Sequence, residues 1–428
     1  MSNKTIITVG QAEGDFIGND NGALQAAVEA AVEKGGGTVV IGPGCYDMHD
    51  SLHLSSNVTI RGSGEETVLR KTAIVKSGLS ADLGYGHFDV SLAEPDRFRV
   101  GMGVHIKDKN SGGFYTTVAT LTWREEDRFG ISRFLNHDYS RKNECIVRSV
   151  YPIISGYHLE NVAIENLSID GNRDENEYLN GCRGGGIFLL QAAEVSIRGV
   201  SIRRYNGDGI SFQQTRDVHI EDCICEGNNG HGLHPGSGSV RPVMRRVRCM
   251  GNENDGIFYC LRVSFSLTED CELKNNGGVG ISVGGRDTDH LIRNNHIEAN
   301  GGNGLFFRPG DEAMAGHRCQ FEGNRLIGNC VKKNQGEIFI DGATQDVHLL
   351  NNSISPASHD DRRAIGIVVG KEASRIVACG NEMDSEAQAF ELEGDEGALV
   401  RTSPETALNV GPDAAPVGAA RHLVHRDP

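Results

Sequence analysis

Short apolar runs recur at a nearly constant spacing along the middle of the chain. Each run opens on a glycine, and successive glycines lie 23, 23, 24, 24 and 24 residues apart. These glycines are Gly186, Gly209, Gly232, Gly256, Gly280 and Gly304. A second apolar stretch, such as residues 218–220, follows each run after a turn. Self-similarity at a fixed period is typical of repeat architectures, and short runs bounded by Asn-Gly or Asp-Gly turns indicate strands rather than helices.

A period in the low twenties also occurs in leucine-rich repeats. The leucine and asparagine consensus of that repeat is missing, however, and no helical segment fits between the strands. We therefore predict an all-β fold, a single right-handed parallel β-helix solenoid with an N-terminal capping helix. Longer coils open near Gly336 and Gly366, and apolar stretches at 162–164 and 58–60 extend the solenoid backwards.

The two ends and one internal stretch depart from the repeat. Residues 21–34 carry a helical stripe of apolar positions, which predicts a helix that caps the solenoid. Residues 71–150 break the period and contain alternating strands and Trp123, which predicts a β insertion on the solenoid flank. The predicted organisation is thus a cap helix and first coil (1–70), the insertion (71–150), the β-helix core (151–402) and a loose C-terminal tail (403–428).

Strand alternation sorts the side chains of each coil, because successive residues point to opposite faces. The residue after each glycine is predicted to be buried: Ile187, Ile210, Leu233, Ile257, Ile281 and Leu305. The next residue and the residue before each glycine are predicted to face outward. The first outward set is Phe188, Ser211, His234, Phe258, Ser282 and Phe306, and the second is Gly185, Asp208, His231, Asp255, Val279 and Asn303.

Composition and charge narrow the class of protein. Glycine reaches 56 of 428 residues and aromatic residues only 6%, which suits short strands and turns. The net charge of −16 argues against a nucleic-acid or anionic-membrane partner, because both would be repelled. No stretch resembles a signal peptide or a membrane span. The expected location is cytoplasmic for the chain as written, or secreted if a leader was removed.

Eleven cysteines are present without a Cys-x-x-Cys pair. Four of them, Cys223, Cys249, Cys271 and Cys319, are predicted to recur at one place in successive coils. We interpret them as a stack of reduced thiols inside the solenoid, where they fill small apolar positions.

The opening of the chain resembles a known superfamily. Asp20-Asn21, the helix, Gly35-Gly36-Gly37-Thr38, the Pro43-Gly44-Cys45-Tyr46 turn and Ser56-Asn57-Val58-Thr59-Ile60 look like the start of pectate lyase-like proteins, in particular the rhamnogalacturonase and epimerase-like module. With the repeats, the resemblance extends to about residue 400. It implies a right-handed parallel β-helix, but the superfamily contains hydrolases, lyases, epimerases, transferases and phage tailspikes.

Two finer similarities fall on the coil of Gly232. Gly230-His231-Gly232 with Gly236-Ser237 is similar to an element of polygalacturonases, with Asp208 in the place of their second paired aspartate. Gly207 replaces the first aspartate of that pair, and Phe258 and Cys260 replace the uronate-binding Arg and Lys. The same coil is similar to the Asp-Pro-His site of mannuronan epimerases, with His234 for the aspartate and Gly236 for the histidine. Both resemblances imply a functional location rather than a complete mechanism.

The candidate catalytic residues are Asp208, His231, His234 and Asp255, on three adjacent coils. Strands lie about 4.8 Å apart, so two coils would separate the aspartates by roughly 9 to 10 Å, near the upper end of the spacing in inverting glycosidases. One carboxylic acid would protonate the leaving oxygen and the other would activate water. Aspartates before glycine also simply make tight turns, so this alternative stays open. His234, in mid-strand, could serve as an acid or base near neutral pH.

The candidate substrate-binding residues recur on the same face. Arginines could hold sugar carboxylates in a bidentate fork, although any one of them could be a solvated surface residue. Exposed phenylalanine rings would give sugar rings an apolar platform. The set is Arg183, Phe188, Gln213, Phe258, Arg262, Arg286, Phe306 and Arg308.

No cofactor or metal is predicted. His231 and His234 could form a metal pair, but a third ligand is not evident. The acidic loop 170–177 could hold calcium, yet it lacks the glycine and closing glutamate of an EF-hand. Gly35-Gly36-Gly37 follows a helix instead of preceding one, so nucleotide binding is discounted, and no nucleophile elbow is present.

The sequence therefore predicts a carbohydrate-active enzyme that cleaves glycosidic bonds in a polysaccharide or oligosaccharide, with hydrolysis favoured. The first alternative is a uronide lyase or epimerase, in which His234 abstracts a proton and Arg262 neutralises the carboxylate. The second is a non-catalytic glycan-binding or tailspike-like protein. The expected partner is a glycan, and a homo-oligomer such as a trimer is an open alternative.

Overall fold

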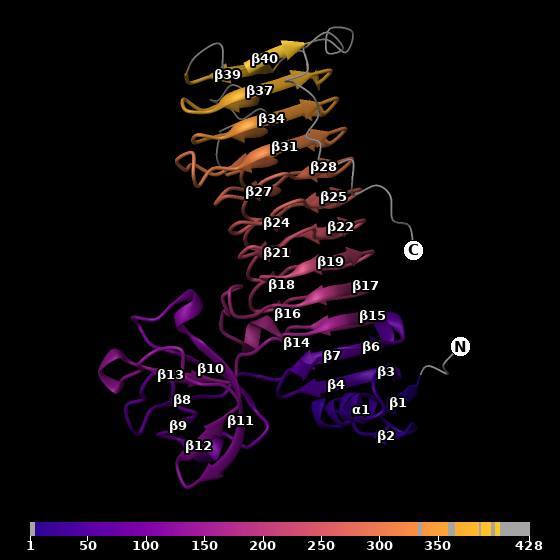
Figure 1. Ribbon diagram of the computed structural model, residues 1–428, viewed down its shortest axis with the longest axis vertical. Helices are drawn as coiled ribbons and strands as arrows, with labels where there is room; N and C mark the ends of the chain where they lie inside the picture. Colours follow the sequence, from indigo (N-terminus) through magenta and orange to yellow (C-terminus); the bar gives the residue numbers. More distant parts are fainter. Residues whose placement is uncertain (1–4, 333–335, 358–363, 385–386, 395–398, 403–428) are drawn as a thin grey trace. The chain divides into compact units, whose positions relative to one another are not determined.

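The computed structural model describes residues 5–332, 336–357, 364–384, 387–394 and 399–402 (Figure 1). These residues form two compact units. The first contains the chain up to Ala192 together with Gly199–Ser211 and Asn228–Gly230. The second contains Ala193–Arg198, Phe212–Gly227 and the described chain from His231 on. The predicted tail, 403–428, lies outside the described residues.

The first unit opens with a helix between short strands. Helix α1 (Asn21–Glu33) begins at Asp20, whose side chain accepts a hydrogen bond from the Gly22 amide, as an N-cap residue does. Its buried residues are Leu24, Ala27, Val28 and Ala31, as the apolar stripe predicts. The helix packs against strands β1 (Ile6–Gly10), β2 (Phe16–Ile17) and β3 (Gly37–Ile41).

Parallel strands stack into coils within the first unit. One ladder runs β1, β3, β6 (Val58–Arg61) and β15 (Glu160–Asp170). A second runs β4 (Gly44–Met48), β7 (Thr67–Lys71) and the end of β15. A third runs β5 (Leu52–His53), β14 (Ile154–Tyr157) and β16 (Ile187–Leu190). Three strand ladders per coil are the arrangement of a parallel β-helix.

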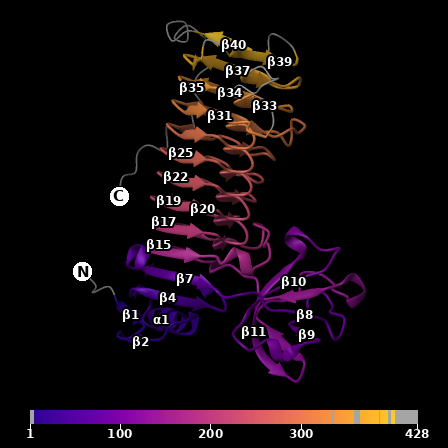
Figure 2. The same ribbon diagram turned by 180° about the vertical axis from the view of Figure 1, so that it is seen from behind.

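Residues between β7 and β14 form an antiparallel sheet beside these coils (Figure 2). Its strand order is β8-β13-β10-β11-β12-β9. The strands are β8 (Lys76–Gly78), β9 (Asp89–Ser91), β10 (Gly103–Lys107), β11 (Thr117–Glu125), β12 (Arg128–Ile131) and β13 (Ile146–Arg148). The sheet has its own hydrophobic core, which includes Val90, Val104, Leu121 and Phe129. We call residues 76–148 the insertion sheet; the domain boundaries themselves stay a prediction.

Short 3₁₀ helices complete the first unit. They are η1 (Gly64–Glu66), η2 (Pro95–Arg97), η3 (Gly113–Tyr115), η4 (Arg141–Asn143) and η5 (Arg173–Glu175). The chain passes from the first unit to the second within β17 (Ala193–Arg203) and β18 (Ile210–Gln213).

The second unit repeats three short parallel strands in each coil (Figure 1). One ladder contains β19 (Arg216–Glu221), β22 (Val243–Arg245), β25 (Leu267–Glu269), β28 (Leu291–Arg293), β31 (His317–Glu322), β34 (Gln345–Leu350), β37 (Ser374–Cys379) and β40 (Leu399–Thr402). Another contains β20 (Ile224–Glu226), β23 (Arg248–Met250), β26 (Glu272–Lys274), β29 (His296–Glu298), β32 (Arg325–Ile327), β35 (Ser353–Ser355) and β38 (Glu382–Met383). The third contains β21 (Leu233–Gly236), β24 (Ile257–Phe258), β27 (Ile281–Val283), β30 (Leu305–Phe307), β33 (Ile338–Ile340), β36 (Ile365–Val369) and β39 (Gln388–Leu392).

The core follows the predicted alternation on its buried side. All six residues that follow the repeat glycines, from Ile187 to Leu305, have no exposed surface. The cysteine prediction needs a correction. Cys223, Cys249, Cys271 and Cys319 are buried free thiols, but they do not form one column. Cys249 pairs in register with Cys225, and Cys319 lies in β31 opposite Val347. The thiols therefore fill small core positions in different ladders.

The predicted outward face is largely covered, which corrects a second expectation. Phe188, Ser211, His234 and Ser282 are all buried, whereas Phe258 and Phe306 keep part of their surface. Chain outside the repeat provides the cover where contacts can be traced. The Ser211 hydroxyl, for example, donates to the Gly181 carbonyl at 2.6 Å. Alternation gives the direction of a side chain but not what lies above it.

Candidate active site

The predicted site residues divide between the two units. Arg183, Asp208 and Phe188 belong to the first unit. The others belong to the second unit: Gln213, His231, His234, Asp255, Phe258, Arg262, Arg286, Phe306 and Arg308. The spacing predicted between Asp208 and Asp255 therefore stays a prediction, and the site is built here from the second unit.

His231 and Asp255 form a polar pair at the openings of β21 and β24. The Asp255 amide donates to His231 Nδ1 at 3.1 Å, and one carboxylate oxygen lies 3.5 Å from the same nitrogen. The other carboxylate oxygen accepts the Val279 amide at 2.8 Å. Each of the two side chains keeps 15% of its surface exposed. Because Nδ1 accepts, the neutral ring of His231 carries its proton on Nε2.

Aromatic contacts join His234 and Phe258 to this pair. Leu233 and Ile257 are paired in register, which places the residues that follow them side by side. The His231 ring stacks on Phe258 with centroids 4.4 Å apart and an interplanar angle of 9°. The His234 ring meets both edge-on, at 5.5 Å from His231 and 5.3 Å from Phe258. Two imidazoles and a phenyl ring thus form one compact cluster.

Arg308 supports this cluster from the other face of Phe258. Its guanidinium lies 4.4 Å from the Phe258 ring centroid, a cation–π distance. The same guanidinium donates to Ser282 Oγ and to the Tyr259 carbonyl, each at 2.6 Å, and lies 3.3 Å from Asp287. Burial lowers the pKa of Arg308, although Asp287 opposes that shift. Arg308 is therefore committed to protein groups, so it positions Phe258 rather than offering its fork to a ligand.

Asp287 is a buried partner that the sequence did not identify. Its two carboxylate oxygens accept the amides of Val263 and Gly284 at 2.9 and 3.0 Å. Burial raises the pKa of Asp287 to about 7, against the opposing effect of these hydrogen bonds and of Arg308. Asp287 follows Gly284-Gly285, which is typical of an ordinary turn. The local sequence therefore does not distinguish this buried aspartate from one on the surface.

Arg262 and Arg286 lie on exposed turns with positive φ, 58° and 65°. Arg286 donates its Nε to the Ala313 carbonyl at 2.7 Å. The Arg262 guanidinium makes no hydrogen bond or ion pair with any residue that the structure describes. No described residue bonds to its five donors, and its role in binding a substrate stays a prediction.

Two further predicted residues of the second unit have different surroundings. Gln213 is fully buried, and its amide lies over Gly236, where a Cβ would come within 2.6 Å of Oε1. Gln213 lies on the outward face of β18 but is covered there, and its role in substrate binding stays a prediction. Phe306 keeps a partly exposed ring, 5.6 Å from Phe339.

The predicted residues of the first unit are covered by their own unit. Asp208 is fully buried, with a carboxylate oxygen so close to Gly230 that a Cβ there would lie 2.0 Å away. Phe188 meets Tyr157 edge-on at 5.7 Å, and Arg133 of the insertion sheet lies over Tyr157. Arg183 donates to the Phe114 carbonyl and lies 5.1 Å from its ring. Exposure was expected for all three predicted residues; Asp208 and Phe188 are buried, and Arg183 is half-buried.

The acidic loop after β15 pairs its carboxylates with cations instead of gathering them. Asp170 lies 3.4 Å from Arg70, Asp174 pairs with Arg204, and Glu177 pairs with Lys76 and Arg148. The carboxylates point toward separate partners, so the loop does not provide the convergent oxygen set that calcium needs.

A chain of hydrogen bonds near β5 resembles a serine hydrolase arrangement. Ser155 Oγ and His53 Nδ1 lie 3.0 Å apart, and His53 Nε2 lies 3.0 Å from Asp50. The Thr120 hydroxyl also donates to Asp50 at 2.7 Å. Only 2% of Ser155 is exposed, and its hydroxyl is bonded to His53. This group stabilises the junction between β5, β14 and β11.

No helix among the described residues is both long and apolar enough to cross a membrane.

Comparison with known proteins identifies the repeat. Residues 143–289, 185–354 and 264–401 each match the profile of the right-handed β-helix region, and together these matches cover more than half of the chain. Alginate lyase 7 from Azotobacter vinelandii is 32% identical over 143 residues, which cover 28% of this chain. The alignment spans only 16% of that relative.

Solved structures with the same fold have different activities. The A-module of a mannuronan C-5 epimerase from Azotobacter vinelandii has a TM-score of 0.55 at 16% identity, covering 91% of this chain and 96% of its own. The surface protein and adhesin PfbA of Streptococcus pneumoniae has a TM-score of 0.56 at 13% identity, covering 89% and 97%. At these identities the likeness shows the fold, and the activity has to be argued from the site.

Proposed function

We propose that this chain, which belongs to the right-handed β-helix family and has the pectate lyase-like fold, is a carbohydrate-active enzyme that deprotonates a uronate unit of an acidic polysaccharide. The result is β-elimination, or epimerisation if the proton returns to the opposite face. The observation that carries the proposal is the pair of imidazoles, His231 and His234, with centroids 5.5 Å apart beside the partly exposed Phe258 ring. The local identity to an alginate lyase supports an acidic sugar as the substrate.

The two histidines can fill complementary roles. His231 accepts at Nδ1 from the Asp255 amide, so its Nε2–H is the donor that can protonate a leaving oxygen. His234 then acts as the base that takes the proton next to the sugar carboxylate. In β-elimination this C–H bond breaks, its electron pair forms the new C=C bond, and the C–O bond on the adjacent carbon breaks. The leaving oxygen receives the proton from His231.

Arg262 and Phe258 supply binding. Proton removal beside a carboxylate is easier when a cation compensates the negative charge that develops on its oxygens. Arg262 follows β24 by a few residues, and its guanidinium makes no hydrogen bond or ion pair with a described residue. Phe258, held between His231 and Arg308, offers a partly exposed ring edge to the sugar.

Hydrolysis is the second candidate, because the Asp255 carboxylate is reachable beside His231. The sequence favours hydrolysis on the pairing of Asp255 with Asp208. The complete burial of Asp208 against Gly230 counts against that pair, since an inverting mechanism needs both carboxylates at the substrate.

The decisive test is a panel of alginate, polygalacturonate, hyaluronan and a neutral glucan, assayed for reducing ends and ultraviolet absorbance together. New reducing ends with absorbance of unsaturated products support elimination. Deuterium incorporation from D₂O without chain cleavage supports epimerisation. Reducing ends without absorbance would replace the proposal by hydrolysis. Binding without any of these products would leave a glycan-binding protein.

Substitutions assign the roles. His234→Gln and His231→Gln are each expected to lower kcat by about 10²- to 10⁴-fold, the usual contribution of a general acid or base. His219→Gln, at an exposed histidine of β19, is the matched control and should leave kcat unchanged. Activity that survives both site substitutions contradicts the assignment.

A further inference from the structure

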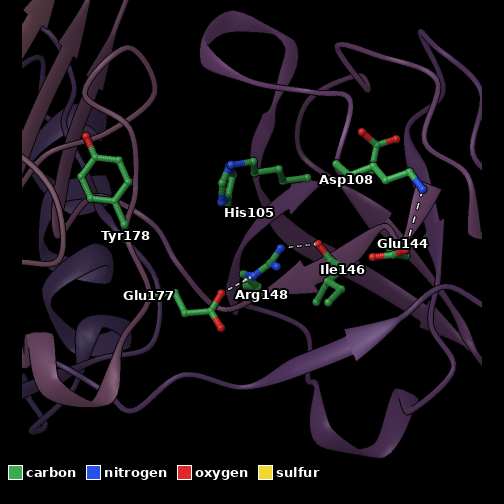
Figure 3. A pocket seen from close by; sticks show the side chains of 9 residues that line it. His105, Asp108, Glu144, Ile146, Arg148, Glu177 and Tyr178 are labelled. Carbon is green, nitrogen blue, oxygen red and sulfur yellow. Dashed lines mark hydrogen bonds and ion pairs between the residues drawn. The ribbon is translucent and has the colours of Figure 1, made fainter.

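The first unit contains a cavity of about 420 Å³, and no residue of the histidine cluster lines it (Figure 3). One wall is formed by β10 and β13 of the insertion sheet, and the other by Glu177 and Tyr178 of the loop after η5. The volume falls within the roughly 300–1,000 Å³ of small-molecule sites. The cavity is thus large enough for a single sugar ring.

The buried ring of His105 is the feature of this cavity that most strongly indicates a ligand. It lies on β10 directly opposite Arg148 of β13, and only 3% of it is exposed. Both of its ring nitrogens are buried, and neither has a hydrogen-bond partner among the residues that the structure describes. Burial and the cations Arg148 and Lys107 lower the pKa of His105 to about 3, so the ring is neutral at pH 7. It therefore offers one donor and one acceptor to whatever enters.

A buried polar side chain without partners is rare in folded proteins and calls for an explanation such as a ligand. Asp108, also lining the cavity, has the same feature. One of its carboxylate oxygens accepts the amides of Asn110 and Ser111, each at 2.9 Å, whereas the other is buried without a partner among the described residues. Two side chains that line the same cavity thus have hydrogen-bonding atoms without a described partner.

The charges of the cavity walls indicate the kind of ligand. Arg148 is paired with Glu177 and donates to the Ile146 carbonyl at 3.2 Å (Figure 3). Lys107 is two residues from His105 on the same strand and hence on the same face. Its ammonium makes no hydrogen bond or ion pair with a residue that the structure describes. One free cation near several acceptors suits a ligand with one negative charge and several hydroxyl groups.

Tyr178 completes the site as an aromatic wall. Its side chain is partly exposed, with 48% of the residue surface accessible. Rings in this setting provide an apolar face against which the C–H side of a sugar can pack. A phosphate has no apolar face to pack on this ring, and because it carries more negative charge than a single carboxylate, Asp108 and Glu177 would repel it more strongly.

We propose that this cavity is a second glycan-binding site, which holds one uronate unit between Lys107, His105 and Tyr178. The carboxylate of the sugar contacts Lys107, its hydroxyls exchange hydrogen bonds with His105 and Asp108, and its ring packs on Tyr178. The site binds and does not react. The choice of a uronate rests on the proposed function, whereas the existence of the site rests on the cavity alone.

The test is calorimetric titration of the full chain with a diglucuronate or digalacturonate, carried out in the His234→Gln background so that turnover does not interfere. Lys107→Ala and Tyr178→Ala change exposed residues that the fold does not require, and each is expected to weaken binding at this site at least about tenfold. Lys142→Ala, an exposed lysine of the same insertion outside the cavity, is the matched control and should bind as the parent does. In NMR, the His105 ring resonances should shift on titration.

Each result separates the two proposals. Binding that is lost in Lys107→Ala but kept in Lys142→Ala supports the site, even if no polysaccharide is converted. Equal binding of the neutral disaccharide overturns the role of the carboxylate, and equal binding of inorganic phosphate overturns the sugar. Uronate binding that both cavity variants leave unchanged, or no binding in the parent, overturns the site while catalysis at His231 and His234 can still stand.

Discussion

The buried asparagines of the coil stack in the second unit and the buried His105 of the insertion sheet in the first unit differ in how their polar atoms are satisfied. In the coil stack, buried asparagines bond to their own copies one coil on. Asn252 Nδ2 donates to Asn276 at 2.9 Å, and Asn276 Nδ2 donates to Asn300 at 2.9 Å. In the insertion sheet, buried His105 has two ring nitrogens without a described partner.

The asparagine ladder has a defined end. Asn300 donates to Asn329 at 2.8 Å, and Asn329 donates to the Glu337 carboxylate at 2.6 Å. A second ladder runs in the same way through Asn295, Asn324, Asn352 and Asn381. Each amide also donates to a backbone carbonyl, as Asn276 does to Cys249 at 3.0 Å.

Repetition supplies the hydrogen-bond partners of the buried asparagines. A repeated coil supplies every side chain with an identical neighbour about 4.8 Å away, so an amide, which both donates and accepts, completes its own bonding. A histidine in a unique sheet has no copy of itself. His105 lines the cavity of the proposed second site, where a ligand could supply the missing partners of its ring nitrogens.

The largest expected effect comes from removing the insertion core. Phe129→Ala should destabilise the insertion sheet by about 3–5 kcal/mol, the usual cost of a buried phenylalanine. Trp123 is the only tryptophan and lies in β11 of this sheet, so its fluorescence follows insertion unfolding in urea. Circular dichroism, dominated by the coils, should keep a transition at the parent midpoint.

The control for this change is Phe134→Ala, at a residue with 46% of its surface exposed, which should shift the fluorescence midpoint little. A common shift of both transitions in Phe129→Ala would mean that the insertion and the coils unfold together. The two regions would then differ in the hydrogen bonding of their buried polar groups but not in when they unfold.

Removing one asparagine of the ladder tests how much the ladder stabilises the coil stack. Asn276→Ala leaves buried donors and acceptors of Asn252 and Cys249 unbonded, and should cost about 2–4 kcal/mol in the free energy of unfolding. Asn275→Gly, at the exposed neighbour with φ 56°, is the control and should change stability by less than about 0.5 kcal/mol. Urea midpoints measured by circular dichroism decide between them. Equal effects would show that the ladder contributes no more than a turn residue does.

Much of the fold could be predicted because the coils repeat at a nearly constant spacing in the sequence. Glycines 23 or 24 residues apart gave the strands, and alternation gave the six buried residues from Ile187 to Leu305. The contact of His231, His234, Asp255 and Phe258 also follows from coil spacing, while their catalytic roles stay a prediction. The asparagine ladder was missed although Asn252, Asn276 and Asn300 recur every 24 residues.

The exposure of the outward residues could not be predicted, because it depends on chain from outside the repeat. Phe188 is covered by Tyr157, and Arg183 is held by Phe114, which lies about seventy residues earlier. No sequence spacing relates His105 to Arg148, Glu177 and Tyr178, which line the cavity with it. Asp208 looks like a catalytic aspartate and a turn aspartate equally well, and only its burial separates the two.

The ladder end predicts a pH dependence of stability. Burial raises the pKa of Glu337 to about 7, above its usual 4.5. Between these values the folded protein keeps a proton that the unfolded chain has lost, so the free energy of unfolding falls as the pH rises from 4.5 through 7. The loss is on the order of 3 kcal/mol and is complete above pH 7. Urea unfolding of the parent and of Glu337→Gln at several pH values in this range measures the effect. The free energy of unfolding should fall with pH more steeply in the parent than in Glu337→Gln. Equal pH dependence in both proteins would show that Glu337 does not titrate.

The smallest effect is expected at the surface, where charged pairs also recur from coil to coil. Arg246 contacts Asp222 at 2.6 and 3.1 Å, and Arg241 contacts Asp217 at 2.7 Å, in both cases 24 residues apart. These pairs repeat as the asparagines do, but water competes for their charges and salt screens them. Arg246→Gln, which keeps the aliphatic stem, should therefore cost less than about 1 kcal/mol, and less still in 1 M salt. If it costs as much as Asn276→Ala in the same urea titration, repetition itself stabilises the coils regardless of burial; a small effect means that burial gives the ladder its strength.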